Sequence, residues 1–484
     1  MRLSELFATC EHQLIGEDVA IQRIEFDSRQ VKPGDLFVCV VGTFEDGHIF
    51  AEGALVAGAS ALLVQRELPL DVPQVVVPNT RIAMAEASAC FYDYPARKMK
   101  MIGVTGTNGK TTTTYMIKGI AEEAGYRVGL IGTITNLIGN EVIPSEHTTP
   151  ESADLHALLA QMVNEGVTLC VMEVSSHSLA QHRVHGIDFD IAVFTNLSQD
   201  HLDYHKTFEG YREAKKMLFA QCKRAVYNVD DVNGMYMLKG ADIPALTMGI
   251  RENADIWAKE IEVTPQGVRF DMQLPGEDLM HIRLQIPGLF SVYNALSAAT
   301  TCFMLGCRAI DIKRGLERLA SVSGRIEPIP VGDRDFTMLL DYAHTPDALE
   351  NVLRTIRGFA DGRIVTLFGC GGARDHAKRP IMGEVVGRYS DFCIITSDNP
   401  RNENPMDIIA QVEEGVKKTA CDYIVIENRR EAIRYAIEHA QRSDVILLAG
   451  KGHETYQEVA GIKTHFDEKE IVAAIFAEEE RADD

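Results

Sequence analysis

The stretch Gly106-Thr107-Asn108-Gly109-Lys110-Thr111-Thr112 decides how the middle of this chain folds. It follows the apolar run 101–104 and opens a segment that is compatible with a helix. Its two glycines allow backbone N–H groups to face phosphate oxygens, Lys110 can reach the terminal phosphates, and Thr111 can place its hydroxyl on Mg²⁺. The stretch therefore predicts a site for a nucleoside triphosphate between a strand and a helix.

The loop departs from the common phosphate-binding pattern at one position. That pattern has a glycine six residues before the lysine, where this chain has Val104. A shorter variant of the loop is expected. The alternative interpretation is a glycine-rich turn between a strand and a helix that carries an incidental lysine.

The composition limits the classes of protein to consider. A chain of 484 residues with 46% hydrophobic content is expected to form about three domains with packed cores. Its formal net charge of -22 argues against nucleic acid or an anionic membrane as the main partner, because both are bound by basic surfaces.

The ten cysteines include no C-x-x-C pair, so neither a zinc site nor a disulfide framework is indicated. No export signal or long apolar run is found, so we expect a cytoplasmic protein that is not inserted in a membrane.

The order of the expected elements divides the chain into three domains of the α/β class. We expect a small N-terminal α/β domain at 1–98, a central P-loop domain with a parallel sheet at 99–328, and a C-terminal Rossmann-like domain at 329–484. The strands behind this division are expected at 24–26, 36–41, 74–77, 101–104, 127–131, 169–174, 191–195, 337–340, 364–368, 392–396 and 445–448, with a small-residue helix at 50–58.

Polar residues that directly follow predicted strands are the first candidates for a binding site, because ligands of open parallel sheets bind outside the carboxyl ends of the strands. In the central domain one strand ends at Glu173, and another leads to Asp200-His201. Glu173 and Thr111 together would offer Mg²⁺ the oxygen ligands that it prefers. His201 is either close to a metal or an ordinary capping or core histidine, and the residues alone leave both open.

The C-terminal domain repeats this arrangement. Polar clusters follow its predicted strands at 369–375, 398–401 and 450–454. Arg374 and Arg401 could bind carboxylates in a bidentate manner, and the Glu454 carboxylate could take an ammonium group. The clusters together suit an amino acid, although each alone is also compatible with a structural turn.

In combination these motifs resemble the Mur ligase family of ATP-dependent amino-acid ligases, over nearly the whole chain. The resemblance is carried by the phosphate-binding loop, the segment 173–177, Asp200-His201, the three C-terminal clusters, Asp27-Ser28-Arg29, Pro33-Gly34-Asp35-Leu36-Phe37, His147-Thr148-Thr149-Pro150, Asn294, Gly324-Arg325 and Asp341-Tyr342-Ala343-His344-Thr345-Pro346. It implies an enzyme of peptidoglycan synthesis that uses ATP and Mg²⁺. Within the family, the chain is most similar to the ligases that extend UDP-N-acetylmuramoyl-L-alanyl-D-glutamate.

The segment Asp398-Asn399-Pro400-Arg401 matches the form that the family associates with meso-diaminopimelate rather than L-lysine. meso-Diaminopimelate has a carboxylate that lysine lacks, and Arg401 could bind it. An unpaired guanidinium would disfavour lysine by several orders of magnitude. The alternatives are a lysine-adding relative, a folylpolyglutamate synthetase-like ligase, and a nucleotide-binding regulator of the same fold.

Carried over position by position, the resemblance assigns a set of residues to each substrate. ATP would be bound by Gly106, Thr107, Asn108, Gly109, Lys110, Thr111, Thr112, Asn294, Arg325 and Asp341. The UDP-muramoyl dipeptide would be bound by Ser28, Thr148, Thr149, Ser175, Gln181 and Arg183. The incoming diaminopimelate would be bound by Arg374, Asp398, Asn399, Pro400, Arg401, Gly450 and Glu454. The metal ligands would be Thr111, Glu173, His201 and a carbamylated Lys215, and the catalytic residues Lys110, Lys215, His201 and His344.

The resemblance also implies a reaction in two steps. The D-glutamyl carboxylate would attack the γ-phosphate of ATP, and the amine of diaminopimelate would capture the acyl phosphate, while Lys110, His344 and Mg²⁺ neutralise phosphoryl charge. Lys215 aligns with a lysine that is carbamylated in the family, which would make it an oxygen ligand for Mg²⁺. Without the resemblance, it would be interpreted as a solvated helix lysine. We expect a monomer that binds small-molecule substrates and closes around them.

Overall fold

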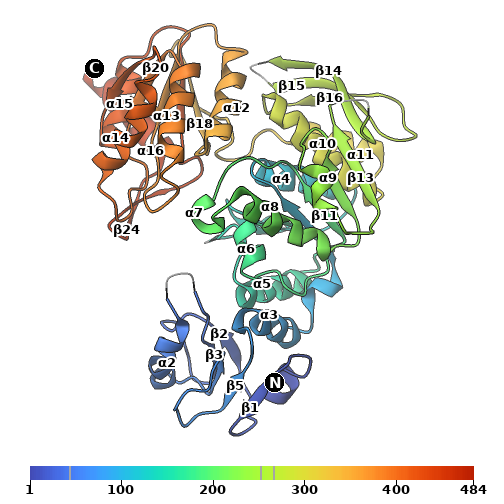
Figure 1. The fold of residues 1–484 in the computed structure, drawn as a ribbon. Helices are drawn as coiled ribbons and strands as arrows, with labels where there is room; N and C mark the ends of the chain where they lie inside the picture. The colour runs from blue at the N-terminus through green and yellow to red at the C-terminus, as the bar shows by residue number, and fades with distance from the viewer. Residues whose placement is uncertain (43–44, 146, 251–252, 265–266, 484) are drawn as a thin grey trace.

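The computed structural model describes residues 1–42, 45–145, 147–250, 253–264 and 267–483. Three α/β domains follow one another along the chain, from the N-terminal domain in blue through the central domain in green to the C-terminal domain in orange (Figure 1). The predicted three-domain α/β fold is confirmed. Within the described residues, no helix is both long and apolar enough to cross a membrane.

The N-terminal domain is built on a sheet with the strand order β1-β5-β4-β3-β2, in which β1 pairs antiparallel with β5 and the other neighbours are parallel. Its elements are α1 (Leu3–Leu6), β1 (Gln13–Ile15), β2 (Arg23–Glu25), β3 (Asp35–Val38), η1 (Gly47–Phe50), α2 (Ala51–Ala57), β4 (Ala61–Val64), β5 (Gln74–Val76), α3 (Thr80–Phe91) and η2 (Pro95–Lys98). The strands and the helix expected here are confirmed within a few residues. Helix α3 is missed, because its buried side chains lie all around the helix and leave no polar face to give a period.

The central domain has a large mixed sheet with the order β16-β15-β14-β13-β12-β11-β6-β10-β7-β8-β9. Its strands are β6 (Lys100–Thr105), β7 (Val128–Ile131), β8 (Asn136–Ile138), β9 (Glu141–Ile143), β10 (Leu169–Glu173), β11 (Ile191–Phe194), β12 (Ala225–Asn228), β13 (Ala245–Gly249), β14 (Ile256–Thr264), β15 (Gly267–Gln273) and β16 (Met280–Leu284). Its helices are α4 (Lys110–Glu123), α5 (Ser152–Asn164), α6 (Ser176–Ala180), α7 (Leu202–His205), α8 (Phe208–Lys216), η3 (Met217–Ala220), α9 (Gly234–Met237), α10 (Leu289–Met304) and α11 (Ala309–Arg318).

The central sheet is parallel in its middle and antiparallel at both edges. The strands from β7 and β10 through β6 to β14 are parallel, as expected, but β14-β15-β16 at one edge and β7-β8-β9 at the other are antiparallel. In β15 the apolar residues Val268, Phe270 and Met272 alternate with polar ones. This alternation is typical of an antiparallel strand with one face on the core.

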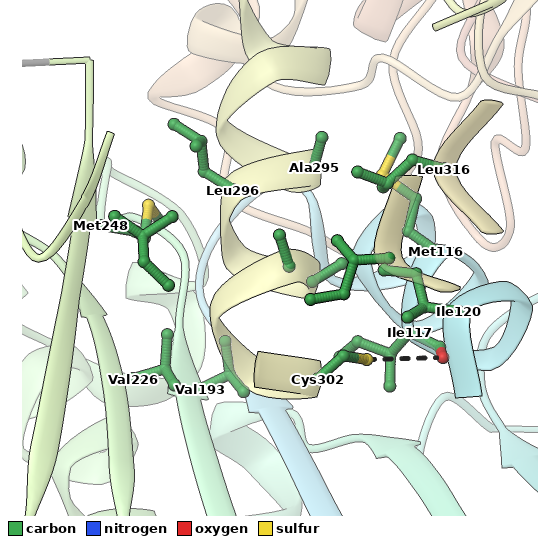
Figure 2. Close-up of a cluster of buried hydrophobic side chains, with 14 of the residues drawn as sticks. Met116, Ile117, Ile120, Val193, Val226, Met248, Ala295, Leu296, Cys302 and Leu316 are labelled. Carbon is green, nitrogen blue, oxygen red and sulfur yellow. Dashed lines mark hydrogen bonds between the residues drawn. The ribbon is translucent and has the colours of Figure 1, made fainter. Parts of the chain in front are cut away.

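Helix α10 forms the centre of the core on one face of this sheet (Figure 2). Leu296 on α10 packs in one cluster with Val193 and Val226 of the sheet and with Ile117 of α4. Helices α4 and α11 approach closely, since a Cβ added to Gly315 would lie 2.4 Å from the Ile120 Cα. This packing holds the body of α4, which begins directly after the phosphate-binding loop.

The C-terminal domain has a sheet with the order β17-β18-β22-β19-β20-β21, which is parallel except for β17. Its elements are β17 (Glu327–Ile329), β18 (Thr337–Asp341), α12 (Pro346–Arg357), β19 (Ile364–Phe368), α13 (Lys378–Tyr389), β20 (Phe392–Ile395), α14 (Pro405–Val416), β21 (Asp422–Val425), α15 (Arg429–Glu438), β22 (Val445–Ala449), the hairpin β23 (Tyr456–Val459) and β24 (Ile462–His465), and α16 (Glu468–Asp483).

The predicted boundary between residues 328 and 329 needs correction. It falls inside β17, whose residue Glu327 pairs with Leu340 of the C-terminal sheet. The change of domain therefore lies between α11 and β17. The proposed first boundary, after residue 98, lies just before β6 begins at Lys100.

Candidate active site

The phosphate-binding loop connects β6 to α4, as the sequence predicts. Gly109 is the N-cap of α4 and has a φ of 86°, a conformation that favours glycine. A Cβ at this position would lie 2.3 Å from the Asn294 Oδ1 of α10, so the expected nucleotide residue Asn294 does lie against the loop. The Lys110 Nζ donates to the carbonyl oxygens of Gly106 and Thr107, at 2.9 Å each. Burial lowers the pKa of Lys110.

Thr111 and Glu173 lie together, at the ends of α4 and β10. The Thr111 hydroxyl donates to the Glu173 carboxylate at 3.0 Å, and the same hydroxyl accepts from the Arg325 Nη2 at 3.1 Å. Glu173 also accepts from the backbone N–H and the hydroxyl of Thr133. Within the described residues, no group of three or more His, Cys, Asp or Glu side chains is placed to hold a metal ion. A hydroxyl and a carboxylate beside the phosphate-binding loop nevertheless match the oxygen donors that Mg²⁺ takes in combination with substrate phosphates.

Lys215 is fully buried, which makes the interpretation as a solvated helix lysine wrong. Its Nζ donates to the Gly106 carbonyl oxygen at 2.7 Å and lies 4.5 Å from the centre of the Tyr211 ring. Burial, together with the nearby Lys110, lowers the pKa of Lys215 well below its usual value. An amine that loses its proton easily can act as a nucleophile, which carbamylation by CO₂ requires.

His201 caps the short helix α7 with a φ of 55°, and its Nε2 lies 3.4 Å from Asp200. Its ring lies edge-on to His177, with 4.7 Å between the ring centres. The Nζ of Lys378, from the C-terminal domain, lies 3.9 Å from the same Asp200. Burial lowers the pKa of His201 well below its usual value. The histidine is therefore uncharged at neutral pH.

His344 lines the cavity between the domains. Its Nδ1 lies 2.7 Å from the Tyr342 carbonyl oxygen, which can only accept, so Nδ1 carries the proton. Burial and the nearby Lys378 lower the pKa of His344 to about 4. The ring is uncharged at neutral pH in this structure. Its Nε2 is then an unprotonated acceptor.

The amino-acid cluster is assembled around a lysine that the prediction did not include. The Lys451 Nζ is fully buried and donates to the Asn399 Oδ1 at 3.1 Å, with Glu454 at 3.4 Å. The Asn399 Nδ2 donates to Glu454 at 2.8 Å. Burial and the nearby Asp398 raise the pKa of Glu454. Gly450 lets Asp398 approach, since a Cβ at Gly450 would lie 2.6 Å from its Oδ2.

Several residues expected at the muramoyl dipeptide are engaged within the protein. The Thr149 hydroxyl donates to the Glu173 carbonyl at 2.8 Å, and the Ser175 Oγ caps α6. Arg183 donates to the Thr149 carbonyl at 2.9 Å and to Gln181. The Thr148 hydroxyl is hydrogen-bonded to the Thr133 hydroxyl, at 3.1 Å, and Thr133 in turn donates to Glu173. Asp341, expected at the nucleotide, accepts from the backbone N–H groups of Ile326 and Ala343, at 2.7 Å each.

One cavity of about 790 Å³ joins these sites between the central and C-terminal domains. It is lined by most of the predicted site residues, including the phosphate-binding loop, Glu173, His201, His344, Arg374, Arg401 and Glu454. The predicted residues that do not line it are Ser28, Gly106, Gln181, Lys215 and Pro400. Ser28 lies in the turn after β2 in the N-terminal domain. Lys378 and Asp347 line the cavity and were missed, because neither directly follows a strand.

Three models of known protein families match this chain, and together they cover most of it. The model of the Mur ligase family catalytic domain matches residues 20–102, the Mur ligase middle domain matches 104–302, and the Mur ligase glutamate ligase domain matches 324–452. The chain belongs to the Mur ligase family. Its central Mur ligase domain thus contains the phosphate-binding loop, and its C-terminal Mur ligase domain contains the amino-acid cluster except Glu454, which lies just beyond the match.

Curated relatives match this Mur ligase over its full length. It is 50% identical to a UDP-N-acetylmuramoyl-L-alanyl-D-glutamate–2,6-diaminopimelate ligase of Caldanaerobacter subterraneus subsp. tengcongensis, over 99% of this chain and 100% of the relative. A ligase of the same name, numbered 1, from Clostridium acetobutylicum is 47% identical with the same coverage. A solved structure of a 2,6-diaminopimelate ligase of this name is 32% identical, with a TM-score of 0.68 and 99% of each chain covered. MurF of Acinetobacter baumannii, 19% identical with a TM-score of 0.68 over 98% of each chain, shares the fold.

Proposed function

We propose that this Mur ligase adds meso-diaminopimelate to UDP-N-acetylmuramoyl-L-alanyl-D-glutamate, with ATP, through an acyl-phosphate intermediate in peptidoglycan precursor synthesis. One observation carries the proposal: a single cavity is lined both by the phosphate-binding loop with Glu173 and by the amino-acid cluster with Arg401 and Glu454. A phosphorylated carboxylate formed on one side would thus be within reach of an amine held on the other. The names of the similar relatives favour the same reaction.

The chain would first bind ATP with the loop 106–112. Lys110 would turn from the loop carbonyls that it contacts here to the terminal phosphates, since a phosphate oxygen is a stronger acceptor than a carbonyl. Thr111 and Glu173 would hold one Mg²⁺, and His201 with a carbamylated Lys215 would hold a second. Bound there, Mg²⁺ would neutralise charge on the transferred phosphoryl group.

The residues of the C-terminal domain would hold the amino acid. Glu454 would take an ammonium group, and Arg374 and Arg401 would take carboxylates. The unprotonated Nε2 of His344 would accept a hydrogen bond from a donor in the cavity, such as the attacking amine. A cavity closed between two domains would keep water from the acyl phosphate.

Three further features belong to the proposal. The substrates ATP and a UDP-linked precursor favour a cytoplasmic enzyme. A monomer would be sufficient for catalysis, since this chain supplies both the phosphate-binding loop and the amino-acid cluster to one cavity. Ser28 would contact the UDP end of the substrate in the N-terminal domain, outside the cavity.

The experiment is a measurement of phosphate release with ATP, Mg²⁺ and UDP-N-acetylmuramoyl-L-alanyl-D-glutamate, with meso-diaminopimelate or L-lysine added separately and the product weighed by mass spectrometry. Turnover with meso-diaminopimelate alone is expected. Turnover with L-lysine would preserve the ligase but refute the role of Arg401. No turnover with either amino acid would refute the proposal.

A further inference from the structure

Two neighbouring loops carry the guanidinium groups that would bind the amino acid. Arg374 lies on the loop after β19 and Arg401 on the loop after β20, and both line the cavity. Each loop contains a non-glycine residue with a φ of 51°, Ala373 in one and Arg401 itself in the other. Such a conformation is costly and persists only where surrounding contacts enforce it. The contacts that hold the two loops therefore also determine where the two guanidinium groups lie.

The two loops are bonded directly to each other. The Gly372 N–H donates to the Asn399 carbonyl at 2.9 Å, and the Arg401 Nη1 donates to the Gly372 carbonyl at 2.7 Å. The backbones lie so close that a Cβ on Gly372 would be 1.9 Å from the Pro400 carbonyl oxygen. A displacement of either loop would therefore displace the other.

An ion pair between the buried Arg379 and the partly exposed Glu403 joins the same two loops. Arg379, at the start of α13, has no exposed side-chain surface and donates to both carboxylate oxygens of Glu403 at 2.9 Å. Its Nη2 also lies 3.3 Å from the Gly371 carbonyl, and its Nη1 donates to Gln411. Glu403 in turn accepts from the Ala373 N–H. One charged pair thus holds the backbone on both sides of Gly372.

We propose that Arg379 and Glu403 are positioning residues that give this ligase its selectivity for an amino acid with a second carboxylate over L-lysine. The inference rests on the proposed function. Neither side chain lines the cavity, so both would act through the loops that present Arg374 and Arg401. Bidentate binding of a carboxylate needs a guanidinium held in place, whereas the binding of ATP by the central domain does not depend on these loops.

The hydrogen bonds from Arg379 lower the pKa of Glu403 to about 2, against the opposing effect of burial. The pair therefore stays ionised over the whole range in which the enzyme would be assayed. A Glu403→Gln substitution keeps the shape of the side chain and removes this charge. Arg379→Lys keeps the charge but removes the planar fork that binds both oxygens.

The test compares these variants by steady-state kinetics. We expect Glu403→Gln and Arg379→Lys each to raise the KM for meso-diaminopimelate about tenfold, because a charge-assisted hydrogen bond is lost beside the binding loops. The ratio of kcat/KM for meso-diaminopimelate to that for L-lysine should fall. The KM values for ATP and the UDP-muramoyl dipeptide, and kcat at saturating meso-diaminopimelate, should stay within about twofold.

Asp444→Asn provides a matched control. Arg363 and Asp444 form a similar two-bond ion pair, at 3.2 and 2.7 Å, in the same domain, and join the amino ends of β19 and β22, away from the loops. An equal rise in the KM for meso-diaminopimelate in this control would overturn the proposal, as would an equal rise in the KM for ATP in Glu403→Gln. If the wild-type protein turns over meso-diaminopimelate and Glu403→Gln keeps its KM and selectivity, only the positioning role is refuted. If the wild type uses neither amino acid, the proposed function itself fails.

Discussion

Asp347 connects the C-terminal domain to the phosphate-binding loop. It lies in the first turn of α12, and its Oδ2 accepts from the Asn108 Nδ2 at 2.7 Å and from the Ser198 hydroxyl at 3.1 Å. Both partners belong to the central domain. The Asp347→Ala substitution would therefore remove two hydrogen bonds that form only when the domains lie in this arrangement.

The magnitude follows from these two contacts. A hydrogen bond to a charged group contributes about 1.5–3 kcal/mol, but the partial exposure of Asp347 reduces each bond to about 1 kcal/mol. Their loss, about 2 kcal/mol, would change the equilibrium between domain arrangements roughly thirtyfold. We expect kcat/KM for ATP to fall by about ten- to thirtyfold, because the competent arrangement becomes less populated.

The assay measures kcat/KM for ATP in Asp347→Ala, Ser198→Ala and the double variant, with Asp407→Ala as the control. Asp407 lies in the first turn of α14 in the same domain, so its removal tests the loss of an acidic residue at a helix start. The Asp347 and Ser198 effects should not add, since the two side chains share a bond. Equal effects of Asp347→Ala and Asp407→Ala would refute the reasoning.

Three other predictions concern the loop, the core and a buried histidine. Gly109→Ala should weaken ATP binding about tenfold or more in calorimetry, because a left-handed alanine costs about 1–2 kcal/mol and its Cβ would meet Asn294; unchanged affinity would contradict this. Leu296→Ala should lower the free energy of unfolding in urea by about 2–5 kcal/mol, since the side chain is fully buried (Figure 2); a loss below about 1 kcal/mol would show that the cluster collapses around the gap. His156 is buried, and its ring nitrogens have no hydrogen-bond partner within the described residues. Burial lowers its pKa from 6.5 to about 4, so the unfolded state takes up the proton first and stability falls as the pH drops from 6.5 towards 4. His156→Leu should remove about 2 kcal/mol of this acid sensitivity between pH 7 and pH 5, measured by urea unfolding at the two pH values; an unchanged pH dependence would contradict it.

The parts of the fold with a strong local pattern were predictable. The apolar run before the loop, the two glycines and the lysine specify β6, the turn and α4 without reference to distant residues. Strand ends then indicated Glu173 and the C-terminal clusters, because the carboxyl ends of parallel strands meet at one edge. The antiparallel hairpin β14–β15 was missed although the alternation in β15 is visible in the sequence.

The burial of Lys215 could also have been predicted from the sequence. Tyr211, Ala214, Lys215 and Leu218 are spaced as one face of a helix, and all four are buried. By contrast, no local pattern joins Arg379 to Glu403, which are 24 residues apart. The charge of His344 could not be predicted either, since it depends on burial between domains and on the nearby Lys378.

Helix α3 has a consequence for the order in which the chain folds during synthesis. It belongs to the N-terminal domain, but Met84 and Ala87 share a hydrophobic cluster with Ala153 of α5. Arg81 at its start binds Glu151, 70 residues further along the chain, at 3.0 Å. The N-terminal domain therefore cannot reach its final packing until α5 has left the ribosome. A fragment that ends at residue 98 would expose the face of α3 that α5 covers, so the first cooperative folding unit of this chain extends beyond its first sheet.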